Sequence, residues 1–383
     1  MTDKKSILLL TRPICPPWDE GSKDFAYTLA KYASDFEIHL LTCKKSPFQK
    51  PSFRNGGNIV CHDIYTFSEW NFEQKARAYI FLIKEFLIKG GKDYDILHSF
   101  FTPTKLNVFA LKICLRNKKL KTIQTLATLR DDIYSDEHIK KIIHADLIIT
   151  YSDYAKEKLK KIGFGNVQRI YPGIDINLFS PAPKKMELMR KFETKEDDFV
   201  INYTGEYVRL GDMDDVVSVF SDLAKVNKNF KLHLAVRVKN EKDAKKKEEV
   251  GEKFEKEGIF DRVAFIDDGS YVMEDIFNLC DVSIFPAQTM AGKFDIPLVV
   301  PEAMACGKPV IASNLERLKY FLNEENSILI NPGDQESLRD NILYLYSNPE
   351  ARRELGEKGM RFARENFDIL KIVKEYEKVY ESL

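Results

Sequence analysis

The chain has 383 residues, of which 44% are hydrophobic and 31% are charged, a globular balance with enough apolar material for two cores. Its 59 Lys and Arg offset its 59 Asp and Glu, so the total charge does not indicate a nucleic-acid partner. The charge is unevenly divided, because residues 1–180 carry 28 basic and 20 acidic side chains and the rest carry 31 and 39. The basic half is either a solvated lysine-rich surface or a face for anionic lipid or an anionic acceptor.

The cysteines and the apolar runs indicate a cytoplasmic protein. The six cysteines form no CxxC pair, and Cys43, Cys114 and Cys280 lie in apolar runs typical of small core residues in a reducing setting. The apolar run Ser6–Thr11 is shorter than the 7–15 residues, roughly, of a signal-peptide core. No run approaches the roughly 20 apolar residues that span a bilayer. We therefore expect a chain that does not cross a membrane, although it could bind the inner face of one peripherally.

The first half of the chain alternates short apolar strands with amphipathic helices. In chain order we expect strand Ser6–Thr11, helix Ser22–Ala33, strands Glu37–Thr42 and Ile59–Ile64, helix Glu73–Ile88, strand Ile96–Ser99, helix Lys105–Leu115, strands Lys121–Thr125 and Leu147–Thr150, and helix Asp153–Ile162. Such alternation predicts a parallel, doubly wound α/β sheet.

A Pro- and Gly-containing stretch, Tyr171–Pro183, breaks the rhythm, which then restarts. The second series comprises strand Phe199–Tyr203, helix Met213–Val226, strand Lys231–Val236, helix Glu241–Lys256, strand Val263–Ile266, helix Met273–Leu279, strands Val282–Phe285 and Pro309–Ala312, and helices from Gln335 and Glu350. The sequence therefore predicts two Rossmann-like, doubly wound domains that face each other across a cleft, at 1–178 and 179–365. The last helix, 366–383, is expected to pack back toward the N-terminal domain.

The most informative segment is Gly292–Ser313, in which Glu302 is expected to open an apolar helix after a strand and a loop. In an open α/β sheet, ligands bind beyond the carboxyl ends of strands, and a helix N-terminus favours phosphate. A carboxylate in that first turn could accept hydrogen bonds from ribose hydroxyls. It could equally be a favourable first-turn acid with no ligand.

This segment resembles the C-terminal domain of the retaining GT-B glycosyltransferases of the family numbered four. The resemblance rests on Glu302–Ile311, on Glu325-Asn326 with Asn331–Asp334, on Tyr171–Asp175, and on the strand-end Gly205. It covers the C-terminal half strongly and the N-terminal half weakly. It implies a GT-B fold with an N-terminal acceptor domain and a C-terminal domain that binds the nucleotide sugar.

The resemblance also implies roles for individual residues. Glu302 matches the glutamate that holds ribose, and Gly205 matches the glycine that lets the backbone approach the donor phosphates. Ser152 matches a serine near the diphosphate, although an N-cap of the following helix is the more economical interpretation. Gly21-Ser22 matches the loop where the acceptor and the donor phosphate approach.

Other positions depart from the family pattern. Phe294 stands where the family has a carboxylate that hydrogen-bonds the donor sugar, so Asp295 or Lys293 would have to replace it, and we favour Asp295. Glu206 replaces the arginine after the strand-end glycine, which leaves Arg209 as the cation of that loop for the leaving diphosphate.

Two further signals are weaker. Asp212-Met213-Asp214 has the D-x-D spacing of a metal motif, but it opens a helix, so an N-cap with first-turn acids explains it better. His98 ends a strand, where a catalytic role is conceivable, although a lone histidine is more often structural.

The sequence thus predicts a retaining hexosyltransferase that uses a nucleotide-diphosphate sugar, needs no cofactor or metal, and acts on a sugar or lipid-linked acceptor. The competing hypothesis is a catalytically weak protein of the same fold that supports another transferase. It is motivated by Phe294, by Glu206 and by Leu126, which stands near the position where the family often has a histidine.

Overall fold

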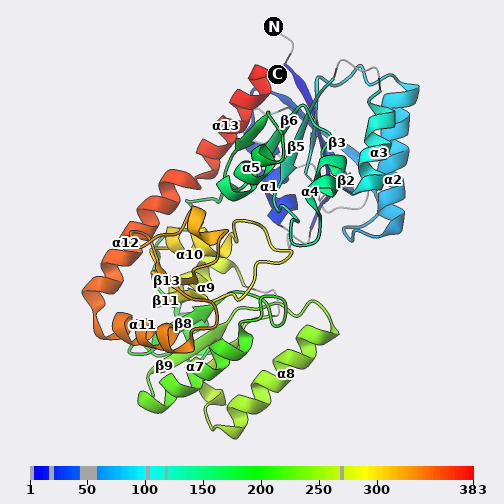
Figure 1. Ribbon diagram of the computed structural model, residues 1–383. Helices are drawn as coiled ribbons and strands as arrows, with labels where there is room; N and C mark the ends of the chain where they lie inside the picture. Colours follow the sequence, from blue (N-terminus) through cyan, green and yellow to red (C-terminus); the bar gives the residue numbers. More distant parts are fainter. Residues whose placement is uncertain (1–3, 17–20, 44–57, 101–103, 117–119, 268–270) are drawn as a thin grey trace. The chain divides into compact units, whose positions relative to one another are not determined.

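The computed structural model describes residues 4–16, 21–43, 58–100, 104–116, 120–267 and 271–383 (Figure 1). The chain divides into two compact units. Unit 1 comprises Met1–Gly173 and Ile369–Leu383, and unit 2 comprises Ile174–Asp368. The first boundary lies earlier than the predicted 178/179, and the second lies later than the predicted 365/366.

Unit 1 contains, within the described residues, a seven-stranded parallel sheet in the order β3-β2-β1-β4-β5-β6-β7. The strand order reverses between β1 and β4, and in such sheets ligands bind beyond the carboxyl ends at the reversal. The strands are β1 (Ser6–Ile14), β2 (Glu37–Cys43), β3 (Asn58–Tyr65), β4 (Ile96–Ser99), β5 (Lys121–Leu126), β6 (Leu147–Thr150) and β7 (Val167–Arg169).

One face of this sheet is covered by α2 (Phe72–Leu82), its π-helical continuation η1 (Ile83–Ile88) and α3 (Lys105–Cys114) (Figure 1). Phe81, Phe86 and Leu111 of these elements share one core cluster with Leu8 and Leu97 of the sheet. Unit 1 also contains α1 (Gly21–Tyr32), α4 (Asp136–Ile142) and α5 (Asp153–Lys161). The single helix predicted for 73–88 is therefore an α-helix that widens into a π-helix.

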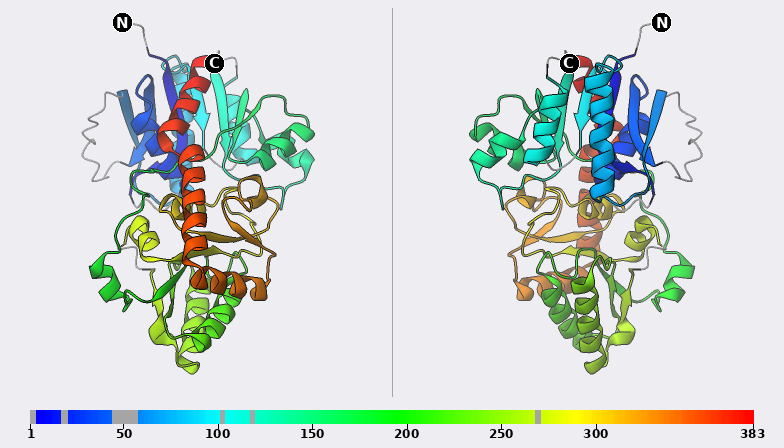
Figure 2. Two further views of the ribbon diagram at one scale, coloured as in Figure 1. Left: turned by 90° about the vertical axis from the view of Figure 1, so that its left-hand side faces the viewer. Right: turned by 90° about the vertical axis from the view of Figure 1, so that its right-hand side faces the viewer.

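The last helix, α13 (Ile369–Ser382), belongs to unit 1 although it follows unit 2 in the sequence (Figure 2). Its buried residues recur every three or four positions, and they include Ile372, Tyr376 and Tyr380. The Tyr376 ring lies 5.5 Å from that of Phe25 in α1. Burial of each such side chain contributes about 1.5–3 kcal/mol, so this apolar face fixes the helix to unit 1.

Unit 2 contains, among the described residues, a six-stranded parallel sheet in the order β10-β9-β8-β11-β12-β13. The order reverses between β8 and β11. The strands are β8 (Phe199–Tyr203), β9 (Phe230–Leu234), β10 (Val263–Phe265), β11 (Val282–Phe285), β12 (Val310–Ser313) and β13 (Ile328–Ile330). Its α-helices are α6 (Met186–Lys191), α7 (Met213–Val226), α8 (Glu241–Lys256), α9 (Met273–Leu279), α10 (Val299–Ala305), α11 (Gln335–Ser347) and α12 (Pro349–Asn366).

The structure joins Cys15 and Cys43 in a disulfide, with their Cα atoms 6.2 Å apart. Cys43 is a buried core residue, as the sequence indicated, but it is paired with Cys15 of the same core cluster. The sequence did not indicate this pairing because the two cysteines are 28 residues apart. The parallel pairing of β1 with β2 brings them together. Among the described residues, no helix is long and apolar enough to span a bilayer.

Candidate functional site

The candidate site of unit 2 lies where the order of its sheet reverses. The loop 204–212 follows β8, and the loop 286–298 follows the neighbouring strand β11. The two loops are joined by a hydrogen bond from the Arg209 guanidinium to the Gly292 carbonyl, at 3.4 Å. Gly292 has a φ of 69°, a conformation that glycine adopts without the strain of a side chain.

Three cations from three loops converge on the carboxylate of Glu206. Arg209 donates to Glu206 Oε1, Lys239 Nζ lies 3.0 Å from the same oxygen, and Lys293 Nζ lies 2.8 Å from it. Arg209 follows β8, Lys239 follows β9 and Lys293 follows β11, so the tertiary fold assembles the cluster. The Glu206 side chain is 8% exposed, whereas those of Arg209 and Lys239 are 44% and 41% exposed.

The charges of this cluster keep Glu206 ionised. Burial by itself raises the pKa of the Glu206 carboxyl, but hydrogen bonds from the three cations and the charge of Lys293 outweigh it and lower the pKa to about 2. Three cations against one carboxylate leave an excess of positive charge at the carboxyl ends of β8 and β11. That excess suits a diphosphate, which could replace Glu206 as the partner of the cations.

Replacing Glu206 with Gln should destabilise the ligand-free protein by about 1–3 kcal/mol at pH 7, a figure reduced for the partial exposure of two of the cations. Because the folded pKa is depressed, the stabilisation is present above pH 4.5 or so and is lost as the pH falls toward about 2. Urea unfolding from pH 7 to pH 3 should therefore show the gap between wild type and variant closing below about pH 4.5. Glu354→Gln, which removes an exposed pair with Lys358, is the control and should leave stability nearly unchanged.

The loop after β8 is held by a buried tyrosine. Tyr203 Oη donates to Asp212 Oδ1 at 2.8 Å and accepts from the Glu206 backbone N–H at 3.2 Å. A Cβ on Gly205 would collide with the Tyr203 ring, so the glycine is required by this contact whatever ligand approaches it. Asp212 stands at the N-cap position of α7, but its side chain accepts a hydrogen bond from the Tyr203 hydroxyl and does not cap the helix. Burial raises the pKa of Asp212 to about 6.

Asp295 is not placed as the sequence suggested. Its side chain has no exposed surface, and its Oδ1 accepts from the Arg317 guanidinium at 3.2 Å. A carboxylate enclosed in this way cannot reach a sugar hydroxyl, so the expected catalytic and sugar-binding role of Asp295 is corrected to a positioning role for its loop. Its neighbour Phe294 is half-buried.

Glu302 lies within α10 rather than at its start. The helix begins at Val299, and Glu302 completes the first turn with a half-buried side chain. The expectation that Glu302 opens the helix is therefore wrong by three residues, because the chain is already helical from Val299 onward.

Two candidates of unit 1 are structural. Ser152 is fully buried and its Oγ accepts from the Ala155 N–H at 3.1 Å, which caps α5 at the carboxyl end of β6. His98 is also fully buried, with Nδ1 2.8 Å from Tyr380 Oη and Nε2 2.7 Å from Thr125 Oγ1. Burial lowers the pKa of His98 well below its usual value, so the ring is neutral. With both nitrogens used inside the core, His98 cannot serve as the catalytic residue that its strand-end position suggested.

Gly21 and Ser22 form the first turn of α1, and their side chains lie outside what the structure describes. Unit 1 contains a hollow between α2 and α3 at the carboxyl end of β1. Its lining residues are Leu10, Thr11, Arg12, Trp70, Lys75, Ala78, Tyr79, Leu82, Asn107 and Leu111.

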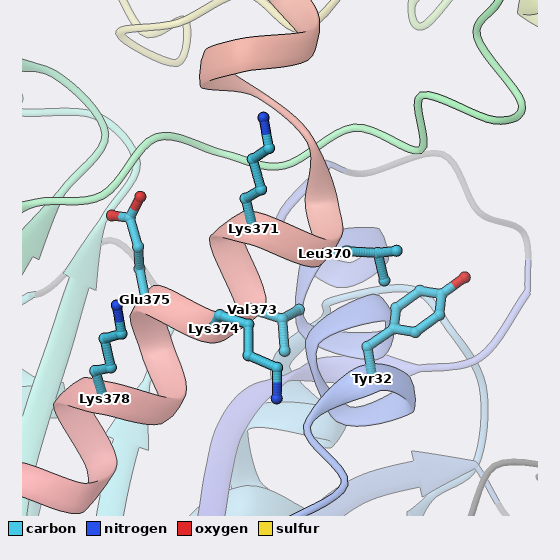
Figure 3. A pocket seen from close by; sticks show the side chains of 7 residues that line it. All are labelled: Tyr32, Leu370, Lys371, Val373, Lys374, Glu375 and Lys378. Carbon is cyan, nitrogen blue, oxygen red and sulfur yellow. The ribbon is translucent and has the colours of Figure 1, made fainter.

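A second hollow of unit 1 lies between α1 and α13 (Figure 3). It is lined by Tyr32, Leu370, Lys371, Val373, Lys374, Glu375 and Lys378, and none of the residues singled out from the sequence is among them. We assign it no part in the reaction.

The sequence missed Lys239 as a member of the cation cluster. The rule that ligands meet the carboxyl ends of strands could have found it, because Lys239 follows β9 closely. No group of three or more potential metal ligands occurs among the described residues.

Comparison with known proteins agrees with this architecture. The profile of the glycosyl transferases group 1 family matches residues 184–362. An uncharacterized glycosyltransferase of Methanocaldococcus jannaschii is 24% identical, over 94% of this chain and 89% of its own length. The N-acetyl-alpha-D-glucosaminyl L-malate synthase of Bacillus anthracis is 22% identical, over 96% of this chain and 95% of its own length.

Solved structures show the same fold over the whole chain. Sucrose-phosphate synthase from Thermosynechococcus elongatus superposes with a TM-score of 0.77 at 18% identity and covers 99% of both chains. HepE from Anabaena, in complex with UDP and glucose, superposes with a TM-score of 0.76 at 16% identity and covers 100% of both. The chain thus has the GT-B fold, and its residues 184–362 belong to the group 1 glycosyl transferases, the retaining family numbered four, whose members transfer sugars from nucleotide-sugar donors.

Proposed function

We propose that the chain is a hexosyltransferase that takes its donor as a nucleoside diphosphate sugar, bound by unit 2. The observation that carries this proposal is the convergence of Arg209, Lys239 and Lys293 on Glu206 at the point where the order of the sheet reverses. UDP and glucose are the ligands of the HepE structure, and the name of the Bacillus anthracis relative contains an N-acetyl-glucosaminyl group. Both support a UDP-hexose as the first donor to test.

In this proposal the diphosphate of the donor displaces Glu206 from the cations and takes its place. When the bond between the sugar and the diphosphate breaks, negative charge grows on the leaving phosphate, and Arg209, Lys239 and Lys293 stabilise it. Because Asp295 is enclosed and His98 lies in the core, neither supplies a general base. The leaving phosphate itself is the group that takes the proton of the acceptor hydroxyl.

We assign the hollow between α2 and α3 to the acceptor. It combines apolar walls, such as Leu82 and Leu111, with the cations Arg12 and Lys75. It lies at the carboxyl end of β1, next to the reversal of the sheet of unit 1. An acceptor with an apolar part and an anionic group fits this lining, which favours a lipid-linked sugar over a free one.

We also propose that the protein acts in the cytoplasm at the inner face of a membrane, where reducing conditions would open the Cys15–Cys43 disulfide that the structure contains. Fractionation of cells that express the tagged chain would decide the matter, and recovery from an oxidising compartment would contradict it.

Replacing Glu302 with Gln should weaken nucleotide binding by about 1–3 kcal/mol, the usual contribution of a hydrogen bond to a charged group. The half-buried carboxylate of Glu302 would accept from the ribose hydroxyls, and the amide does so less strongly. Titration calorimetry with UDP measures the change, while the melting temperature should stay the same. Glu336→Gln, on the exposed first turn of α11, is the control, and equal affinities for all three proteins would refute the assignment.

A catalytically weak binding protein remains the second candidate, because Phe294 and the enclosed Asp295 leave the expected sugar-binding carboxylate unreplaced. A turnover assay distinguishes the binding protein from the hexosyltransferase. It uses UDP-glucose or UDP-N-acetylglucosamine with an added lipid-linked or soluble sugar acceptor. Nucleotide binding without turnover of any hexose donor would favour the binding protein.

A further inference from the structure

Two neighbouring helical segments of unit 1 expose large apolar side chains to solvent. α2 with η1 and α3 lie side by side on one face of the sheet (Figure 1, Figure 2), and Tyr79 Oη and Asn107 Oδ1 link them by a hydrogen bond. Their exposed apolar residues, which we call the outer face, are Phe72, Ile80, Ile83, Leu87 and Ile88 on α2 and η1, and Leu106, Phe109 and Ile113 on α3. Phe72 is 86% exposed, Ile88 76% and Leu106 65%.

The outer face is separate from the core. The same helices bury Phe81, Phe86 and Leu111 against the sheet, so the apolar residues of the outer face are additional to those that fold unit 1. A helix that is apolar on both sides has a partner on each side, or it lies in an apolar medium. Contiguous apolar patches on a monomer mark interaction sites.

Cations are interleaved with this apolar surface. On α3, the exposed residues Lys105 and Lys112 alternate with Leu106, Phe109 and Ile113 along one side of the helix. The segment Lys105–Cys114 contains no acidic residue.

The acidic residues of α2 and η1 do not offset these charges. Glu85 is buried and pairs with Lys89 at 2.8 Å, and Glu73 pairs with Arg77 at 2.9 Å. Lys84 adds an exposed cation to the same side. An apolar stripe edged by Lys and Arg, without free acids, is the composition of helices that lie in the interface of an anionic bilayer.

We propose that the outer face of α2, η1 and α3 docks on an anionic lipid bilayer. The apolar side chains enter the boundary between headgroups and acyl chains, and Lys84, Lys105 and Lys112 meet the lipid phosphates. The acceptor hollow lies between the same two helices, so docking would bring it to the membrane surface, and this link alone rests on the proposed function.

A second copy of the chain fits this surface less well. A two-fold dimer would place the outer face against itself and bring like charges together. The outer face offers no unpaired carboxylate that could offset the lysines of the other copy. An acidic bilayer supplies the complementary charge over a broad area.

The test is co-sedimentation of the full chain with vesicles of phosphatidylcholine alone or mixed with phosphatidylglycerol, at low and high salt. We expect binding to the anionic vesicles and its loss at high salt. Lys84→Gln, Lys105→Gln and Lys112→Gln together should reduce the partition coefficient by roughly 100-fold, since each cation near the surface contributes about a factor of five. Leu106→Ser with Phe109→Ser should weaken binding to anionic vesicles at both salt concentrations, because it removes buried apolar area.

Matched controls on α4 and the loop before it are Lys140→Gln and Ile133→Ser, which change exposed residues of the same kinds elsewhere in unit 1. They should bind vesicles as the wild type does. Nucleotide affinity by calorimetry should be unchanged in all variants, so a failure of docking is distinguished from a failure of the donor site. Equal binding of the wild type to neutral and anionic vesicles would overturn the proposal. So would a dimer, seen by analytical ultracentrifugation, that the wild type forms and the outer-face variants lose.

Discussion

Replacing Lys293 or Arg209 with Met should lower turnover by about 10²–10³-fold, the usual cost of losing one preorganised group that stabilises charge in the transition state. Both side chains contact Glu206 in the ligand-free protein, and both would contact the diphosphate once it displaces that carboxylate. Lys293 is the better enclosed of the two, with 22% of its side chain exposed against 44% for Arg209, so its loss should have the larger effect.

The measurement pairs steady-state turnover with titration of UDP and of uridine. Affinity for UDP should fall in both variants, and affinity for uridine should not, because uridine carries no phosphate. Lys225→Met, which removes an exposed lysine of α7 paired with Asp222, is the matched control. If UDP and uridine lose affinity equally, the two residues shape the loop and do not bind phosphate.

Replacing Asp295 with Asn should destabilise unit 2 by about 3–5 kcal/mol, since it leaves the enclosed guanidinium of Arg317 without its carboxylate. The substitution preserves the shape of the side chain, so the loss comes from charge alone. Thermal and urea unfolding measure it, and the affinity of the folded variant for UDP should be retained.

The double variant Asp295→Asn with Arg317→Met is the control for this effect. Removing both charges of a buried pair is often close to neutral, so the double variant should recover part of the lost stability. A variant Asp295→Asn that keeps its melting temperature but loses turnover would restore Asp295 as the sugar contact.

Much of the fold could be predicted from the sequence, because local patterns determine it. The helix predicted at Glu241–Lys256 is α8 with the same bounds, and it is capped by Asn240, whose side chain accepts from two backbone N–H groups. The three-residue strands β7 and β13 escaped prediction, whereas the equally short β10 lies within the predicted strand Val263–Ile266. The first turn of α10 escaped because Val299 and Val300 fit a strand as well as a helix.

The candidate site could be predicted only in part. The family resemblance indicated the loop after β8, where Arg209 was the cation left beside Glu206. Asp295 was assigned to the sugar because the sequence shows a carboxylate beside Phe294 but does not show Arg317, which is 22 positions away and encloses it. His98 was a candidate catalytic residue because it ends a strand. Only the packing of α13 shows that Tyr380 Oη forms a hydrogen bond with Nδ1 of its ring.

By itself, the sequence determined the alternation of strands and helices, the two-domain α/β class and the family resemblance, since these depend on periodicity and on short contiguous motifs. The tertiary structure decided which charges meet. Lys239 and Lys293 join Arg209 on Glu206 because three parallel strands end at the same edge of one sheet. It also decided that the apolar residues of α2, η1 and α3 include a second, exposed set, since a sequence pattern cannot distinguish an apolar side chain that meets the core from one that meets solvent.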